Sequence, residues 1–397
     1  MSNHLSLPQG FLFSACAAGI KTSGRADLAL ALIPEGAAAA ALFTRNQVVA
    51  APVIIGRNHL RASHGHVRAL IVNAGNANCA TGKPGLEAAK SVCTAMASEL
   101  RIEPAQVFPS STGIIGVPLP VEKITSSLSH LAVTAKSGPE AFDSFAHAIL
   151  TTDTRKKIAS ETIVRKSGAV TLTGVAKGAG MIHPNMATML VYLFSDVAAS
   201  PPDLQRCLRG AVDESFNNIS IDGDTSTNDT VLFLASGKSG VKLKQVRKEF
   251  ERALKNVCGS LAQQIIADGE GVTHVVRLKI EQARTEEEAR RVARAVANSP
   301  LVKTAWAGAD PNWGRILAAI GYSGVKINPS RINIYLGSQQ VCRHGAASPF
   351  DKSAAHRYMT QASYEIRILL GAGQTKLDFL SCDLTAEYVH INADYST

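Results

Sequence analysis

Residues 177–190 read Lys177-Gly-Ala-Gly-Met-Ile-His-Pro-Asn-Met-Ala-Thr-Met-Leu190, and they say more about this chain than any other stretch. The glycines allow backbone angles that other residues avoid, and Pro184 fixes its own φ and favours an extended residue before it. The apolar run 190–194 that follows is typical of a buried strand. We therefore expect a broken loop that delivers Ala187 and Thr188 to the head of a strand.

A small residue followed by threonine at such a loop suits self-cleavage. The Thr188 hydroxyl could attack the Ala187 carbonyl, shift the acyl group to an ester and let water cut the chain. Thr188 would then carry a free α-amine, whose ordinary pKa of roughly 7.7–8.0 lets it act as the base for its own hydroxyl. The plainer alternative is a threonine that simply starts a strand. A phosphate cradle at 177–180 is disfavoured, because the P-loop spacing is absent and a strand follows in place of a helix N-terminus.

Other unusual blocks follow one another along the chain. They are Asn73-Ala-Gly-Asn-Ala-Asn78, Ser111-Thr112-Gly113-Ile-Ile-Gly116, Asp222-Gly-Asp-Thr-Ser-Thr-Asn228-Asp229, Asp268-Gly-Glu270-Gly, Asp310-Pro-Asn-Trp-Gly-Arg315 and Tyr388-Val-His-Ile-Asn392-Ala-Asp-Tyr-Ser-Thr397. Together with the loop at 177–190, they resemble the ornithine acetyltransferases (bifunctional glutamate N-acetyltransferase / amino-acid acetyltransferase) of arginine biosynthesis. The blocks keep that family's order from residue 73 to the last residue, and residues 19–53 also fit.

This resemblance implies a threonine-nucleophile acyltransferase that moves acetyl from N2-acetyl-L-ornithine to L-glutamate through an acetyl-threonine intermediate. By position, Thr188 is the nucleophile, the bond between Ala187 and Thr188 is cleaved, and Thr112 and Gly113 match the oxyanion hole. The family's substrate-binding positions fall on Thr154, Lys177, Thr188, Glu270, Asn392 and Thr397. Ser396 departs from the family, where arginine is frequent before the final threonine, and this bears on substrate affinity.

The residue types fit the implied roles. A turn at 110–113 can aim a hydroxyl and a backbone N–H at one point, as an oxyanion hole requires. Lys177 could form an ion pair with a substrate carboxylate, and Glu270 could form one with the ammonium of ornithine. Taken without the resemblance, these are an ordinary Ser/Thr turn, a loop cation and a turn carboxylate. The acidic block 222–229 lacks the glycine and the glutamate of a calcium loop, so we expect a turn or an active-site wall there and no metal.

Composition narrows the class of protein. A chain of 397 residues exceeds the size at which single cores usually stop growing, so two domains or two interlocked layers are expected. The hydrophobic content is 46% with only 5% aromatics, which indicates a core of mainly Ala, Val, Ile and Leu. The net charge of +9 comes without a dense basic run or interleaved aromatics, so nucleic-acid binding is not expected. A mildly positive field would suit anionic substrates such as glutamate.

The cysteines and the N-terminus point to the cytoplasm. Seven cysteines are dispersed without paired short spacings, which favours reduced thiols over disulfides or a zinc site. The apolar run 10–20 is too short to span a membrane and lacks a preceding Lys or Arg, so we interpret it as the first core strand. No membrane association is expected.

Periodicity predicts alternating strands and helices. Strands are expected at 67–72, 169–175, 190–194, 230–234, 274–280, 331–336 and 364–370, and helices near 86–100, 200–211, 243–257 and 285–299. The pattern alone indicates a layered α/β or α+β fold. The resemblance sharpens this to an αββα-type sandwich similar to the N-terminal-nucleophile hydrolases, with different connectivity. Residues 1–187 and 188–397 would be two processed chains of one interwoven fold, paired in a heterotetramer of two alpha and two beta chains.

Two other functions remain open on the sequence. One is an N-terminal-nucleophile aminopeptidase or amidohydrolase that releases the acyl group to water, and the other is a non-enzymatic binding protein. No cofactor is expected. The sequence leaves open whether acetyl-CoA is a second acetyl donor, and whether the enzyme serves arginine synthesis or a related secondary pathway.

Overall fold

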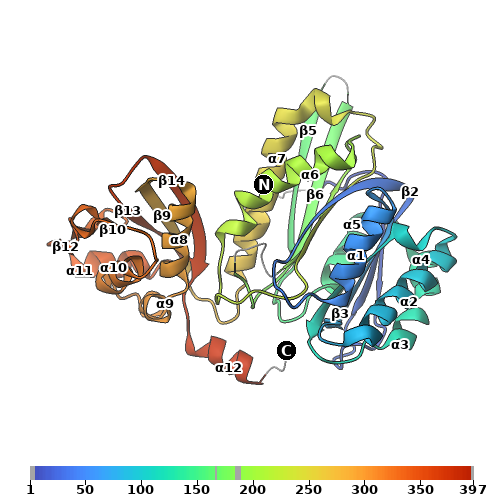
Figure 1. Ribbon diagram of the computed structural model, residues 1–397, viewed down its shortest axis with the longest axis horizontal. Coiled ribbons are helices and arrows are strands. Elements are labelled where there is room, and N and C mark those ends of the chain that lie inside the picture. Colours follow the sequence, from blue (N-terminus) through green and yellow to red (C-terminus); the bar gives the residue numbers. More distant parts are fainter. Residues whose placement is uncertain (1–4, 166–167, 184–188, 395–397) are drawn as a thin grey trace.

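The computed structural model describes residues 5–165, 168–183 and 189–394, and in that part of the chain it holds two β-sheets (Figure 1). The larger sheet has the order β4-β3-β2-β8-β7-β6-β5, with β1 beside β2. Its strands are β1 (Leu12–Cys16), β2 (Leu28–Phe43), β3 (His66–Asn76), β4 (Val107–Ile114), β5 (Lys157–Arg165), β6 (Gly168–Lys177), β7 (Leu190–Ser195) and β8 (Thr230–Ala235). The accompanying helices are α1 (Ala51–Ala62), α2 (Gly82–Leu100), α3 (Val121–Thr125), α4 (Leu128–Thr134), α5 (Pro139–Ala148), α6 (Pro201–Asp213) and α7 (Leu243–Ala267).

Strand β2 belongs to both halves of this sheet. Its first part pairs with β3, its last part pairs with β8, and the β3 register shifts between Leu32 and Ala37. Within the shifted segment, Pro34 has no N–H to donate and Gly36 has a φ of 84°. Such an irregularity bends a strand. The sheet therefore folds over itself at this point, so that its two halves face each other.

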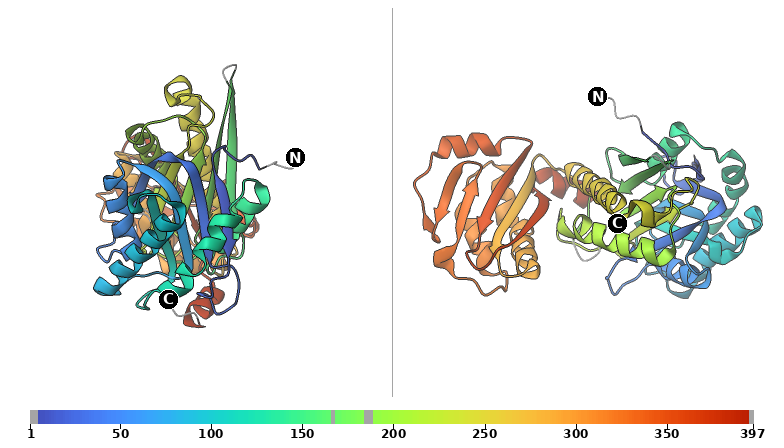
Figure 2. Two further views of the ribbon diagram at one scale, coloured as in Figure 1. Left: turned by 90° about the vertical axis from the view of Figure 1, so that its right-hand side faces the viewer. Right: turned by 90° about the horizontal axis from the view of Figure 1, so that it is seen from above.

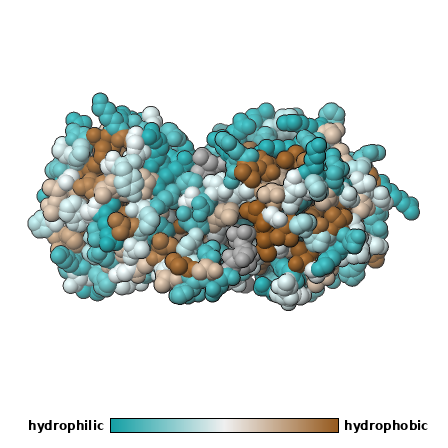
Figure 3. Space-filling model, turned by 60° about the horizontal axis from the view of Figure 1, so that its bottom comes forward, coloured by the Kyte–Doolittle hydropathy of each residue, from teal (hydrophilic) through white to brown (hydrophobic). Residues whose placement is uncertain are grey.

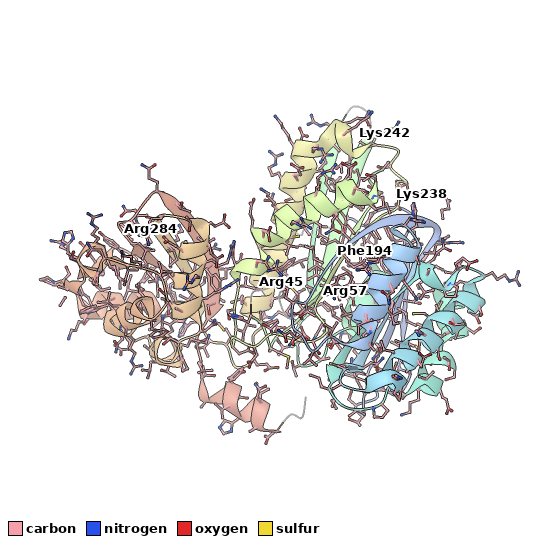
Figure 4. The ribbon with its side chains drawn as sticks, viewed as in Figure 1. Arg45, Arg57, Phe194, Lys238, Lys242 and Arg284 are labelled. Atoms are coloured by element: carbon pink, nitrogen blue, oxygen red, sulfur yellow. The ribbon has the colours of Figure 1, made fainter. Side chains whose placement is uncertain are left out.

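Alternating side chains divide the sandwich into four layers. On β7, Tyr192 and Phe194 point into the space between the two sheet halves, whereas Val191 and Leu193 pack under α6 and α7. On β3, alternate residues likewise face the interior or the helices α1 to α4. Phe194, labelled in Figure 4, is fully buried among aromatic rings, including Phe11 at a centroid distance of 5.2 Å. The predicted αββα sandwich is confirmed.

Residues beyond α7 form a second body, the C-terminal lobe, which lies beside the sandwich when the molecule is seen from above (Figure 2). Its sheet has the order β12-β11-β10-β13-β9-β14. The elements are β9 (Val275–Ala283), α8 (Glu286–Ala297), α9 (Pro300–Ala307), α10 (Trp313–Gly321), β10 (Asn333–Leu336), β11 (Gln339–Arg343), β12 (Ala346–Ala347), α11 (Lys352–Met359), β13 (Ser363–Leu369) and β14 (Thr375–Cys382).

One face of this second sheet is apolar and the other is charged. Apolar residues of β9 and β13 pack with those of α8, α10 and α11 in one cluster. On the opposite face, cross-strand ion pairs join Arg277 to Asp378 and Lys279 to Glu365. Period-two alternation of this kind fits a sheet covered by helices on one side only. The last helix, α12 (Ala386–Asp394), contains no buried residue and lies below the junction of the two bodies in Figure 1.

In the sequence, the predicted cleavage position separates strands that belong to the larger sheet. Strands β7 and β8, which follow residue 188, lie between β2 and β6, which precede it. The boundary between the two sheets falls much later, after α7. Residues 1–187 and 188–397 therefore both build the sandwich, and the cut itself stays a prediction.

Helix starts follow the sequence signals. Ser200 accepts a hydrogen bond from the Asp203 N–H, and Thr285 accepts one from the Glu288 N–H, so both act as N-caps. The Glu288 carboxylate itself binds the Arg284 guanidinium at 2.7–3.0 Å. All seven cysteines are free thiols. Among the described helices, none has the length and apolar character needed to cross a bilayer.

Candidate active site

A pocket of about 220 Å³ opens where several strands of the sandwich end. It gathers the end of β4, the end of β6, the loop before β8, the turn after α7 and the helix α12. Its walls are formed by Ala77, Thr112, Gly113, Ile115, Thr151, Thr152, Lys177, Gly180, Met181, Asp222, Asp224, Ser226, Thr227, Asn228, Glu270, Tyr388 and Asn392.

Most of the predicted site residues that the structure describes meet in this pocket. Thr112, Gly113, Lys177, Glu270 and Asn392 line it, although they come from four separate segments. The segments span residues 112 to 392, so only the fold brings them together.

Of the other predicted positions, the structure describes Thr154, which is not in the lining. Thr154 is exposed, and its hydroxyl donates to Asp268 while its backbone N–H reaches Asp268 Oδ2 at 3.1 Å. Ala187, Thr188 and Thr397 lie outside the described residues, so the nucleophile, the cleavage site and the terminal contact stay predictions.

The turn at Thr112 and Gly113 is held rigidly. Gly113 has a φ of 132° and lies so close to the Gly75 backbone that a side chain would collide with it. Ser111 donates to Asn73 Oδ1 at 2.6 Å, and the Asn228 amide donates to the Ser111 carbonyl at 2.9 Å. These buried hydrogen bonds fix the end of β4, and the fixed turn can present a hydroxyl and an N–H to one point.

Lys177 ends β6 and faces this turn. Its side chain is only 12% exposed, and its Nζ lies 3.2 Å from Thr112 Oγ1 and 4.0 Å from Asp153 Oδ2. Burial lowers the pKa of Lys177 because it disfavours the charged amine, and Asp153 opposes that effect.

Behind Lys177 lies a cluster of buried charges that the sequence analysis did not identify. Lys157 Nζ contacts Asp153 Oδ1 at 2.6 Å and Asp268 Oδ2 at 2.5 Å, and all three side chains have at most 1% exposure. The Gly178 N–H also donates to Asp153 Oδ1, at 2.6 Å. Burial alone would raise the pKa of Asp153, but Lys177 and Lys157 overcome it and hold the value at about 2.

Asp222 anchors the loop that leads towards the predicted cleavage site. Its carboxylate accepts the Met181 N–H at 2.5 Å and the Ile182 N–H at 2.9 Å. Tyr388 of α12 donates its hydroxyl to the same carboxylate at 3.4 Å. Burial raises the pKa of Asp222 to about 6, and the backbone N–H donors reduce that rise.

Glu270 packs against the same loop. A side chain on Gly180 would come within 2.5 Å of Glu270 Oε2, so a larger residue there would displace the Glu270 carboxylate. The Glu270 N–H donates to the Ala179 carbonyl at 2.9 Å, and the Asn392 amide donates to Glu270 Oε2 at 2.8 Å. The predicted partnership of Glu270 and Asn392 within one pocket thus has a direct contact behind it.

Asp229 lies just before β8 and is buried. Its carboxyl group accepts hydrogen bonds from Ser226 and from the backbone N–H of Met189, the residue that follows Thr188. Burial raises its pKa well above the ordinary value. Nearer the pocket, Asp222, Asp224, Ser226, Thr227 and Asn228 line it, so the acidic block 222–229 forms a wall of the pocket, one of the two alternatives expected for it.

The pocket is more acidic than the chain as a whole. Among the lining residues that the structure describes, three are acidic (Asp222, Asp224 and Glu270) and one is a cation (Lys177), although the net charge of the protein is +9. A ligand with an ammonium group is therefore better matched to the local field than the overall charge suggests. Within the described ranges, no group of three or more His, Cys, Asp or Glu side chains is arranged to hold a metal ion.

The fold and the site together define an enzyme of the acyl-transfer class. An αββα sandwich gathers the Thr112–Gly113 turn, the Lys177 amine and the carboxylates of Asp222 and Glu270 in one polar pocket. The family to which the chain belongs is the ArgJ family, whose profile matches residues 12–397. The resemblance noted in the sequence is thereby confirmed.

Individual relatives support this membership over nearly the whole length. The Arginine biosynthesis bifunctional protein ArgJ of Thermus thermophilus is 46% identical over 392 residues, which are 98% of this chain and 99% of that protein. The protein of the same name from Caldanaerobacter subterraneus subsp. tengcongensis is 41% identical over 405 residues, covering 100% of this chain and 99% of its own. A crystal structure of the Bacillus halodurans argJ protein superposes with a TM-score of 0.50 and 38% identity, over 52% of this chain and 100% of that one.

Proposed function

We propose that this protein transfers acetyl from N2-acetyl-L-ornithine to L-glutamate through an acetyl ester on Thr188. The observation that carries the proposal is the pocket itself, which sets the Thr112–Gly113 turn and Lys177 opposite Glu270 at the head of β7. Membership of the ArgJ family, with its relatives named for arginine biosynthesis, supports the same reaction.

The chemistry has two half-reactions, after a first self-cleavage between Ala187 and Thr188. Thr188 Oγ attacks the acetyl carbonyl carbon while its own α-amine accepts the hydroxyl proton. The Thr112 hydroxyl and the Gly113 N–H stabilise the oxyanion, and the C–N bond breaks as the proton passes to the leaving amine of ornithine. The amine of glutamate then attacks the ester, and Thr188 recovers its proton.

Substrate recognition follows from the acidic side of the pocket. Glu270, held by Asn392 at 2.8 Å, is placed to pair with the side-chain ammonium of ornithine. Lys177 provides the cation for a carboxylate, which donor and acceptor share. Thr154 and Thr397 complete the proposed set of substrate contacts.

Steady-state kinetics and intact mass test this proposal. Varying one substrate at fixed levels of the other should give parallel double-reciprocal lines. Mixing the enzyme with N-acetylornithine alone should release about one equivalent of ornithine per site and add one acetyl group to the chain that begins at Thr188. Intersecting lines and an unlabelled chain would contradict the ester. Continuous release of acetate without glutamate would instead favour the hydrolase.

Further parts of the proposal concern the second donor and the assembly. Formation of N-acetylglutamate from acetyl-CoA would identify acetyl-CoA as a co-substrate. We place the enzyme in the cytoplasm, as a heterotetramer of two alpha and two beta chains. Apolar side chains gather in patches on the face seen in Figure 3, which supports association. Light scattering of the processed protein should give twice 41.9 kDa.

A further inference from the structure

The contact between Lys177 and Thr112 has only one possible direction. A lysine ammonium carries three donors and no acceptor, whereas a hydroxyl has one donor and can also accept. At 3.2 Å, Lys177 Nζ therefore donates and Thr112 Oγ1 accepts. The hydrogen of the Thr112 hydroxyl is left for a different acceptor, and Thr112 lines the pocket.

Asp153 determines where the Lys177 ammonium lies. Its Oδ2 is 4.0 Å from Lys177 Nζ, while its Oδ1 is held by Lys157 Nζ and by the Gly178 N–H, each at 2.6 Å. Gly178 is the next residue after Lys177, so one carboxylate fixes both the charge and the backbone at the end of β6. Asp153 is buried and is not part of the pocket lining, so it has no direct contact to offer a substrate.

Lys157 keeps this carboxylate in place. Its ammonium bridges Asp153 and Asp268, and the side chains of all three are buried to 1% exposure or less. A charge buried in this way is held by its partners, because losing one of them leaves the other uncompensated. The order of contact is thus Lys157, Asp153, Lys177 and Thr112.

We propose that Asp153 and Lys157 are positioning residues for the oxyanion site. They keep the Lys177 ammonium charged and against Thr112 Oγ1, which turns the Thr112 hydroxyl hydrogen towards the reacting carbonyl oxygen. Donation from the ammonium also polarises the hydroxyl and strengthens it as a donor. The inference rests on the proposed acetyl transfer and adds to it a reason why the oxyanion site is organised before substrate arrives.

If Lys177 acts in this way, its ionisation sets the alkaline limb of the pH–rate profile, where activity falls with rising pH. Deprotonated Lys177 would be a weaker donor, and its lone pair could accept the Thr112 hydroxyl hydrogen and turn it away from the carbonyl oxygen. Activity should therefore fall as pH rises through the pKa of Lys177, which burial already lowers. The charged groups that act on it are Asp153, Lys157, Glu270, Asp229 and Lys21. Of these, Asp153 is the one in ion-pair contact, and it favours the charged form.

The test is Asp153→Asn, which keeps an oxygen to accept from Lys157 and Gly178 but removes the charge. We expect kcat per processed molecule to fall about 10- to 100-fold, part of the loss seen when one oxyanion donor is removed, with KM changed less than about threefold. The alkaline limb should move down by about one pH unit or more, because the opposite charge beside the amine is gone. Asp153→Glu, which keeps the charge, should retain much of the wild-type kcat and most of the wild-type pH of the alkaline limb.

Asp268→Asn is the matched control. Asp268 is as buried as Asp153 and binds the same Lys157, but it contacts Thr154 and Arg155 and not Lys177. The Asp268→Asn variant should keep the wild-type pH of the alkaline limb, even if it lowers stability or raises KM. An equal shift in both variants, or a wild-type kcat and limb in processed Asp153→Asn, would overturn the proposal.

A double-variant comparison covers the case in which Asp153→Asn does not fold or is not cut. Lys177→Met and Thr112→Val should each lower kcat, and if the lysine acts through the hydroxyl, the double variant should be little slower than the slower single one. If the losses of kcat in the two single variants add fully in the double variant, the inference is wrong. Failure of the proposed function is distinguishable, because wild-type enzyme would then form no acetyl ester at all.

Discussion

The two walls of the pocket are built in opposite ways. One, the buried wall, consists of Thr112 and Lys177 and is backed by Asp153, Lys157 and Asp268, whose charges are paired in the interior of the sandwich. The other, the tail wall, consists of Asp222, Glu270, Tyr388 and Asn392, the last two on a helix without a buried residue. The groups proposed for bond making are on the rigid wall, and those proposed for choosing the substrate are on the adaptable one.

The largest effect should come from the proposed nucleophile, Thr188. Thr188→Ala removes the hydroxyl needed for both cleavage and the acyl ester, so it should leave one chain of 41.9 kDa and no transferase activity. Gel electrophoresis and a transfer assay measure this. Thr188→Ser is the control, which should still be cut and retain some activity. Two chains in the alanine variant would refute the assignment of Thr188.

Breaking the buried wall should cost stability. Lys157→Met leaves Asp153 and Asp268 without the ammonium between them, and removal of one partner from a buried ion pair typically costs about 3–5 kcal/mol. Urea denaturation of the processed protein gives the free energy of unfolding. The exposed pair Lys90–Glu87 is the control, since its loss should cost less than about 1 kcal/mol. Similar values for the two lysines would remove the distinction between buried and surface charge.

Neutralising the tail wall should change selection of the substrate. Glu270→Gln removes the charge proposed to attract the ornithine ammonium, and a charged hydrogen bond is worth roughly 1.5–3 kcal/mol. The rate of enzyme acetylation by N-acetylornithine should therefore fall about 10- to 150-fold. Single-turnover measurements separate this step from deacetylation by glutamate, which should change less. Equal losses in both steps would mean that Glu270 organises the site without distinguishing the side chains.

The carboxylates Asp222 and Asp153 should change the free energy of unfolding in opposite directions as pH rises. Burial raises the pKa of Asp222 to about 6, so the folded protein holds this proton more tightly than the unfolded chain. This group therefore lowers the free energy of unfolding as pH rises from about 4 to about 6. Asp153, with its pKa at about 2, adds stability above about pH 4 that is lost as pH falls towards 2.

Denaturation across this pH range measures both contributions. Asp222→Asn should flatten the loss between pH 4 and 6, and Asp153→Asn should flatten the loss below pH 4. A pH 4–6 slope that is unchanged in Asp222→Asn would show that the proton is held elsewhere.

The smallest effect should come from the exposed end of the tail wall. Asn392→Ala removes the amide that donates to Glu270 at 2.8 Å, at a site open to water. The free energy of unfolding should stay within about 0.5 kcal/mol of wild type. KM for N-acetylornithine should rise a few-fold, because Glu270 is then less firmly oriented. A destabilisation comparable to that of Lys157→Met would mean that α12 is part of the fold's core.

The same contrast explains what the sequence could and could not predict about the fold. The runs at 190–194 and 230–234 are strands, as predicted, and their mainly apolar sequence fits strands that are buried on both faces. Strand β2 was not predicted, since its second half is a run of alanines that follows Pro34 and Gly36. Alanine favours helices, and only pairing with β3 and β8 makes this segment extended.

For the site, the resemblance supplied residues that a pattern could not. Thr112, Lys177, Glu270 and Asn392 do line one pocket, but no periodicity links segments so far apart. Asp153 and Lys157 were missed because each is a single charge without a local motif. Lys157 meets Asp268 across 111 residues of sequence, so their pairing depends on the fold.

The position of β7 and β8 between β2 and β6 has a consequence for how long a cut molecule lasts. Separating the pieces 1–187 and 188–397 would require breaking the β2–β8 and β6–β7 ladders together, which is global unfolding of the sandwich. Exchange of chains between molecules should therefore be no faster than unfolding, whose half-life for stable domains can reach days. Once separated, the pieces must find each other by collision, whereas the uncut chain folded within itself. In a cut molecule, the two pieces should therefore stay together for as long as the sandwich does not unfold.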